Sequence, residues 1–253
     1  MFADVTSQNV VGYNGNDAHG GLNWYVAPFR TVGCNTTDIN SINLDDGATP
    51  GEGNVGWGEP MQIVGPNGDA EGFYMYWHKS MDITGTVETE FFWSDEESNP
   101  VSVSFDAGDG IAIENGAVED FVEYKIKNAG EVDKGDVTFA AHGGLNWTGN
   151  PFPMALPINN INLDDGLTPG EGNVGWGEPM QIVGPNGDAE GFYMYWHKSM
   201  DITGTVETEF FWSDEESNPV SVSFDPGVGF AIENGAVDDF IEYDIKIACP
   251  YSL

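Results

Sequence analysis

The sequence predicts an all-β protein with two tandem antiparallel β-sandwich or barrel-like domains that arose from an internal duplication. Three observations support this prediction. Residues 43–106 recur as residues 162–225, and these two blocks differ only at Ala48, where the second copy has Leu167. Apolar and polar residues alternate with period two along several short runs. Turns rich in Gly, Pro and Asn separate these runs.

The repeat continues outside this block, but with a different offset. The sequence AHGGLNW at residues 18–24 recurs at residues 141–147, so the first copy has four additional residues between Phe29 and Ile42. Each copy has the usual size of a domain. We therefore expect domains at residues 1–129 and 130–253, with a polar linker at about residues 128–136. Recent copying or sequence exchange would explain the identical block without selection.

The expected strands follow from the alternation. Residues 73–78, 86–93, 101–105 and 121–127 each place apolar side chains on one face, and turn signals at residues 66–69, 98–100, 106–110 and 115–116 separate them. Residues 43–60 and 162–179 show no alternation, and we expect extended Gly-rich loops there. Residues 1–13 form a strand-like extension from Val10. We expect this extension to pair with the sheet of a neighbouring subunit.

The charge of the chain excludes several partners. The chain has 42 acidic and 7 basic residues, a formal net charge of −35. Such a polyanion does not bind nucleic acid or an anionic membrane electrostatically. No apolar stretch reaches transmembrane length, so we expect no membrane insertion. Dense carboxylates are best tolerated where salt screens them, which favours an extracellular or cell-surface location.

No motif of a known catalytic type is present, and we expect no enzymatic activity. The sequence has no phosphate-binding loop, no His-Glu-x-x-His and no Gly-x-Ser-x-Gly. Glu88 and Glu90 have a spacing that could serve glycoside hydrolysis, but solvent-facing strand residues have the same spacing. The histidine pairs are more typical of structural residues than of metal or sugar ligands; they are His19 with His142, and His78 with His197.

No motif requires a cofactor, and calcium is the ion that best fits the loops. Hard cations bind carboxylate and carbonyl oxygens on loops. Asp45 and Asp46 supply such groups in the first copy, and Asp164 and Asp165 supply them in the second. The spacing is not that of an EF-hand. Solvated turn carboxylates are the alternative.

Several aromatic residues suit either a glycan surface or a contact between subunits. The candidates are Trp57, Trp176, Tyr76 and Tyr195, with Trp24, Tyr74 and Trp93 as further members of the first-copy surface. Such residues on alternating strands are also typical of a core.

The two cysteines have no counterparts in the other repeat. Cys34 lies in the additional segment of the first copy and Cys249 lies near the end of the chain. Three states remain open: an intramolecular bond, an intersubunit disulfide between Cys34 and Cys249, and two free thiols.

A series of short motifs resembles a known family. Residues 4–13 read DVTSQNVVGY, followed by Ala27-Pro28-Phe29, Val32-Gly33, Leu44-Asp45-Asp46 and residues 107–111. In this order they are similar to a secreted β-rich domain in surface proteins of verrucomicrobial and planctomycete-type bacteria, a family without established activity. The resemblance implies an exported protein and transfers no site.

These observations lead to two functional hypotheses. The first is an extracellular structural protein whose β-domains pack head to tail into a self-assembled filament or surface layer. The second is a glycan-binding adhesin or carbohydrate-binding module with two equivalent sites.

Overall fold

The structure is a computed structural model of the 253-residue chain. It describes residues 11–45, 57–64, 70–81, 84, 87–95, 97, 99–115, 124–133, 135–164, 181–183, 189–191, 193–200, 206–214, 216, 218–234 and 243–251.

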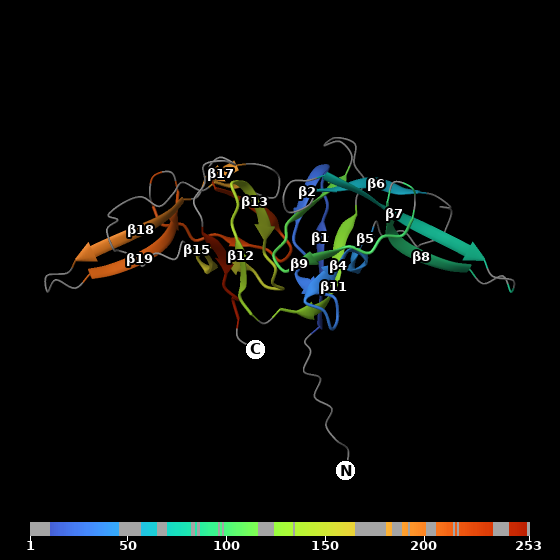
Figure 1. Ribbon diagram of the computed structural model, residues 1–253, viewed down its shortest axis with the longest axis horizontal. Helices are drawn as coiled ribbons and strands as arrows, with labels where there is room; N and C mark the ends of the chain where they lie inside the picture. Colours follow the sequence, from blue (N-terminus) through green and yellow to red (C-terminus); the bar gives the residue numbers. More distant parts are fainter. Residues whose placement is uncertain are drawn as a thin grey trace, which may run out of the picture.

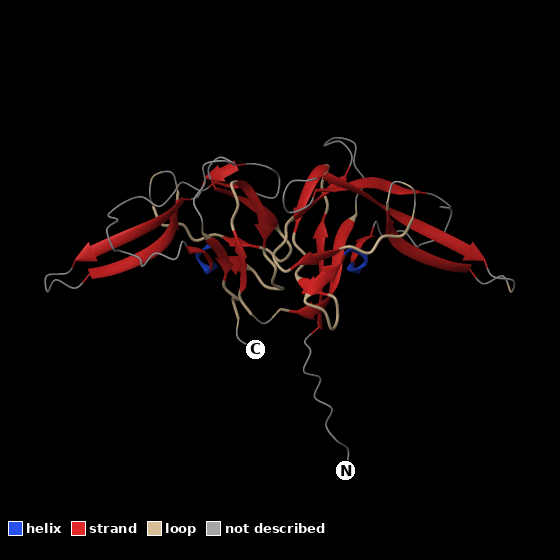
Figure 2. Cartoon of the chain, in the orientation of Figure 1, coloured by secondary structure: helices blue, strands red, loops and turns tan. Residues whose placement is uncertain are grey.

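Almost all regular structure in these residues is β-strand, and every strand pairing is antiparallel (Figure 2). The two helical elements are short 3₁₀ turns, η1 (Ile39–Ser41) and η2 (Ile158–Asn160). The prediction of an all-β, antiparallel fold is therefore confirmed. Within the described residues, no helix is long and apolar enough to cross a membrane.

In the first half of the chain, the described residues form strands β1 to β11. They are β1 (Val11–Asp17), β2 (Gly21–Tyr25), β3 (Phe29–Arg30), β4 (Thr36–Asp38), β5 (Ile42–Asp45), β6 (Trp57–Val64), β7 (Ala70–Met81), β8 (Val87–Ser94), β9 (Ser104–Asp106), β10 (Ile111–Asn115) and β11 (Lys125–Val132). One sheet has the order β1-β11-β3, with β5 also on β11, and another has the order β2-β10-β6-β7-β8. A small sheet pairs β4 with β9.

The described strands of the second half repeat most of this arrangement, although β3 has no equivalent among them and β7 corresponds to both β17 and β18. They are β12 (Val137–Ala140), β13 (Gly144–Gly149), β14 (Leu156–Pro157), β15 (Ile161–Asp164), β16 (Gln181–Val183), β17 (Ala189–Gly191), β18 (Tyr193–Met200), β19 (Val206–Ser213), β20 (Ser223–Phe224), β21 (Gly229–Asn234) and β22 (Asp244–Ile247). The sheet orders are β12-β22-β15 and β13-β21-β16-β17, with two-stranded pairs β14-β20 and β18-β19.

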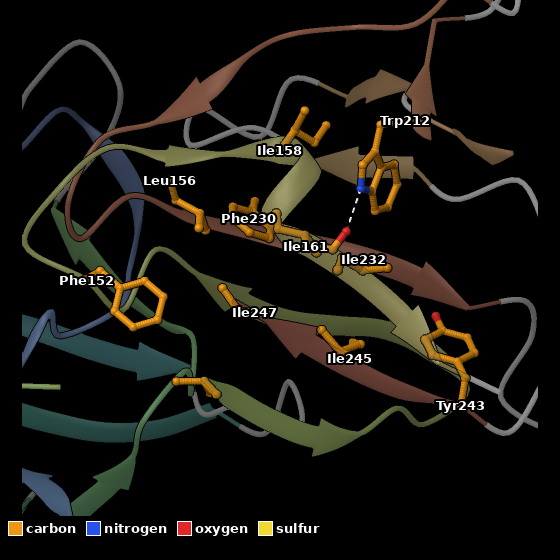
Figure 3. Packing of buried hydrophobic residues seen from close by; sticks show 11 residues of the cluster. Phe152, Leu156, Ile158, Ile161, Trp212, Phe230, Ile232, Tyr243, Ile245 and Ile247 are labelled. Atoms are coloured by element: carbon orange, nitrogen blue, oxygen red, sulfur yellow. Dashed lines mark hydrogen bonds between the residues drawn. The ribbon is translucent and has the colours of Figure 1, made fainter. Parts of the chain in front are cut away.

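Each half has its own cluster of buried apolar residues. The first core includes residues of β2, β5, β8, β10 and β11, and the second includes the equivalents from β15, β19, β21 and β22 (Figure 3). Trp93 and Trp212 are fully buried, and their indole N–H groups donate to the carbonyls of Ile42 and Ile161, each at 2.8 Å. Apolar burial with a satisfied indole donor favours these positions as anchors of the two cores.

The structure corrects two sequence-based expectations near the ends of the first repeat. Residues 128–132 are not linker, because they complete β11, and the predicted domain boundary at 129/130 falls inside this strand. The Val11–Tyr13 stretch pairs with β11 of its own chain, with Val11 opposite Glu131. It is therefore part of the first sheet rather than an added strand of a neighbour. Residues 1–10 lie outside the described residues.

The two halves lie side by side, and two hairpins project from opposite ends of the molecule (Figure 1). These hairpins are β7–β8 and β18–β19, and their sequences are identical.

Candidate functional site

The two repeats meet through equivalent backbone positions. Gly110 of the first repeat approaches Trp147 of the second so closely that a Cβ on this glycine would lie 2.7 Å from the Trp147 carbonyl carbon. A Cβ on the equivalent Gly229 would lie 2.7 Å from the carbonyl carbon of Trp24. Each repeat thus offers the same glycine and the same tryptophan to the other. This reciprocity is the signature of a twofold, isologous contact.

The two equivalent tryptophans stack on each other at the centre of this contact. The ring centroids of Trp24 on β2 and Trp147 on β13 are 3.4 Å apart, and the ring planes differ by 2°. A residue can stack on its own counterpart only near the axis that relates the two repeats. Aromatic pairs contribute about 0.5–1.5 kcal/mol beyond the area that they bury.

A loop from each repeat reaches into the other. Thr148 Oγ1 donates to the Gly108 carbonyl at 2.7 Å, and the Val26 N–H donates to the Gly227 carbonyl at 3.1 Å. The two glycines are equivalent and have φ values of +92° and +78°. Only glycine adopts such values without strain, so both loops depend on it.

The surroundings of the two loops differ although their positions are equivalent. Asn14 and Asn16 on β1 donate side-chain N–H groups to the Pro226 carbonyl at 3.1 and 2.9 Å. On the other side of the contact, Val137 and Phe139 of β12 occupy the equivalent positions and lie against the first repeat's loop. The contact is therefore reciprocal in backbone geometry and asymmetric in side-chain chemistry.

Two further equivalent positions show the same asymmetry. Tyr25 is 1 % exposed, burial raises its pKa, and its hydroxyl has no hydrogen-bond partner among the described residues. Its equivalent is Thr148, whose hydroxyl is satisfied. Asp109 is half-buried, and burial raises the pKa of its carboxyl, whereas the equivalent residue is Val228.

The reciprocal contact restricts how the protein could assemble. An isologous patch that is matched inside one chain is already occupied, so the contact cannot be repeated head to tail between molecules. Assembly between molecules stays a prediction, and it would have to use other surfaces.

His19 and His142 lie in turns that a buried asparagine organises. The His19 N–H donates to Asn23 Oδ1 at 2.8 Å, and Asn23 Nδ2 donates to the carbonyls of His19 and Ile113 at 2.8 and 3.2 Å. His142 and Asn146 repeat this pattern. This motif fixes the start of β2 and β13 and therefore positions the stacked tryptophans. His78 and His197 lie in the hairpins, opposite Glu90 and Glu209 in register.

The proposed calcium ligands are only partly described. The backbones of Asp45 and Asp164 end strands β5 and β15. Asp46 and Asp165 lie outside the described residues. Among the described residues, no group of three or more His, Cys, Asp or Glu side chains is suited to a metal ion.

The aromatic candidates separate into three groups. Trp93 belongs to the first core and Trp24 to the contact between repeats, so neither is an open stacking surface for sugars. The other candidates described by backbone alone are Trp57 on β6, Tyr74 and Tyr76 on β7, and Tyr195 on β18. Trp176 lies outside the described residues.

Both cysteines are free in this single chain. Cys34 is exposed in the turn between β3 and β4, and Cys249 is half-buried after β22. The Cys249 N–H donates to Asp136 Oδ1 at 2.9 Å, and the nearby Tyr251 hydroxyl donates to the Asp133 carbonyl at 2.7 Å. Cys249 and Tyr251 thus attach to the segment that joins the repeats. An intersubunit disulfide stays a prediction.

Sequence reasoning did not identify the contact between the repeats. One signal was available: glycines at 108 and 110 recur at 227 and 229 although the residue between them changes from Asp109 to Val228. Glycines kept in a strand or turn, next to a residue that changes, indicate close approach of another backbone. No family model, curated protein or solved structure matches the chain.

Proposed function

We propose that the chain is an extracellular structural protein whose subunits assemble into a filament or surface layer. We further propose that each repeat is a β-sandwich and that the protein has a structural rather than a catalytic role. One observation carries the proposal: the two repeats close a reciprocal contact at the centre and present identical hairpins at opposite ends (Figure 1).

A molecule with this arrangement has two equal ends. If each end binds one end of another molecule, every added subunit brings one unused end, and growth continues. A subunit with a single isologous patch would instead stop as a dimer. The two-ended arrangement therefore supports an open chain of subunits, with the central contact inside each subunit and the growth contact between subunits.

The charge of the chain makes this assembly dependent on salt. Each subunit has a net charge of −35, and the repulsion between subunits is screened over about 10 Å at 0.1 M salt and over shorter distances in brine. A saline extracellular setting fits this requirement. We expect longer assemblies as the salt concentration rises.

The direct test is to compare the purified full-length chain at low and high salt by negative-stain microscopy and sedimentation velocity. The proposal predicts ordered filaments or sheets that increase with salt and protein concentration. Monomers alone, across both series and with added calcium, would refute it. Non-reducing electrophoresis of the assembled fraction would show whether a disulfide joins the subunits.

A further inference from the structure

The outer parts of the two hairpins have no neighbouring strand in the described structure. Strand β6 pairs with β7 only from Ala70 to Tyr76, while β8 pairs with β7 as far as Met81. Strands β18 and β19 pair with each other alone in the described part. The parts beyond Tyr76 and its equivalent are thus two-stranded ribbons that project from the body (Figure 1). Isolated two-stranded ribbons are marginally stable in water.

The register sorts the ribbon residues into two rows, one on each face. The first row, here called the apolar row, contains the pairs Met75–Trp93, Trp77–Phe91, Lys79–Thr89 and Met81–Val87. The second row, the polar row, contains Tyr76–Phe92, His78–Glu90 and Ser80–Glu88. The second repeat has the same rows from Met194–Trp212 to Met200–Val206. The apolar row starts at Trp93 and Trp212, which are buried in the two cores, and continues outward from them.

The apolar row is free of carboxylates, in contrast to the rest of this acidic chain. Both acidic residues at these register positions, Glu88 and Glu90, lie in the polar row, and the apolar row carries one lysine. When two acidic chains come into contact, the electrostatic repulsion between them is smallest where neither contact surface carries a carboxylate. Among the register positions of the ribbon, the apolar row is therefore the face on which a second copy of this chain can pack at the lowest electrostatic cost.

We infer that the subunits meet through the apolar rows of their projecting ribbons, so that the occupant of each row is the same row of a second copy. The inference rests on the proposed self-assembly and names its contact. Because residues 70–94 and 189–213 are identical, either end of one molecule can meet either end of another. Packing row against row would cover the ribbon faces that extend beyond the cores.

A charge placed in either row separates this contact from a general charge effect. The test variant is Val87→Asp with Val206→Asp, which puts one carboxylate in the apolar row of each ribbon, opposite Met81 and Met200 rather than opposite the lysine. The control variant is Ser80→Asp with Ser199→Asp, which adds the same charge to the polar row. Sedimentation velocity at fixed salt then gives the concentration of half-assembly for each protein.

The inference predicts that this concentration rises about tenfold or more for the test variant, because the new carboxylate would be buried against the apolar residues of the second copy's row. The control should stay near the wild-type value. If the wild type assembles and the two variants behave alike, the inference is wrong while self-assembly stands. If the wild type does not assemble under any condition tested, the proposed function fails and the inference fails with it.

A second measurement needs no variant and guards against misfolding of the test protein. Amide hydrogen exchange of the wild type should slow in residues 77–81 and 87–91, and in their equivalents, as protein concentration rises into the assembly range. Exchange in these segments that is independent of assembly would overturn the inference, even if the aspartate variants prove unstable.

Discussion

The central contact between the repeats and the two projecting hairpins differ in how similar the two copies are in sequence. At the centre the two repeats make reciprocal backbone contacts with different side chains. Asn14 and Asn16 contact the loop of the second repeat, whereas their equivalents Val137 and Phe139 contact the loop of the first repeat. At the ends the sequences are identical. A contact inside one chain always meets the same partner, so its two sides can diverge together. Because recent copying alone would suffice to explain the identity of the ends, the functional proposal rests on the two-ended arrangement and not on that identity.

The largest expected effect comes from filling the backbone contact at the centre. Gly110→Ala or Gly229→Ala would place a Cβ 2.7 Å from backbone atoms of the other repeat. We expect either variant to lose about 2–4 kcal/mol of unfolding free energy, measured by urea denaturation. Gly135→Ala is the control, because no atom lies within 4 Å of its Cβ position. Equal stability of all three variants would show that the two repeats do not pack as described.

The stacking of Trp24 on Trp147 should appear as a coupling free energy between these two residues in a double-mutant cycle. Trp24→Ala and Trp147→Ala should each cost about 2–3 kcal/mol, because each removes a large aromatic side chain from a packed contact. The double variant should cost less than the sum of the two by about 1 kcal/mol, since the first change already removes the stack. Strict additivity in the double-mutant cycle would contradict the stack.

Removal of the hydroxyl group at two equivalent positions, Tyr25 and Thr148, should change the unfolding free energy in opposite directions. Tyr25→Phe removes a buried hydroxyl without a partner in the described residues, so it should stabilise the protein by about 1 kcal/mol. Thr148→Val removes the hydroxyl that donates to the Gly108 carbonyl at 2.7 Å, so it should destabilise by about 1 kcal/mol. Thermal unfolding of the two single variants measures both changes in stability. If both variants are stabilised, or both are destabilised, the two hydroxyl groups do not differ in their hydrogen bonding as described.

The smallest expected effect concerns pH. Burial raises the pKa of Asp109 in the folded protein, so the folded state holds this proton to higher pH than the unfolded state does. The stability from this residue is therefore present below the unfolded pKa and decreases as pH rises through the folded value. Asp109→Asn should remove this decrease and gain less than about 1 kcal/mol at neutral pH. Unfolding curves between pH 3 and pH 7 test this; an unchanged pH profile in the variant would contradict it.

The alternation of apolar residues predicted the all-β class and some of the strands, but the expected loops at residues 43–60 and 162–179 are partly strand, in β5, β6 and β15. Residues 73–78, 86–93 and 101–105 were expected as strands, and the structure places 73–78 within β7, most of 86–93 in β8, and only 104–105 in β9. Period two reports which face of a strand is buried, but it does not report which strand comes next to it. The pairing of β1 with β11 depends on residues more than 100 positions apart and could not be predicted locally.

The contact between the repeats was missed for a related reason. Trp24 and Tyr25 resemble ordinary strand aromatics, and only the second repeat, folded alongside, shows what covers them. Of the candidate calcium and glycan residues, Tyr76 and Tyr195 lie in the hairpins, and Asp45 and Asp164 end strands. For both groups a single sequence provides composition without geometry. The free ends of the ribbons became evident only once the register was known.

The most direct test is to alter the ribbon at one end of the molecule and measure the mass of the assemblies that form. A chain with Val87→Asp alone, or Val206→Asp alone, keeps one unmodified ribbon. By sedimentation equilibrium or mass photometry, both single variants should stop at dimers with twice the 27.4 kDa mass of the chain, under conditions where the wild type forms long assemblies. Long assemblies from either single variant, or monomers from both, would contradict a closed centre with two equal growing ends.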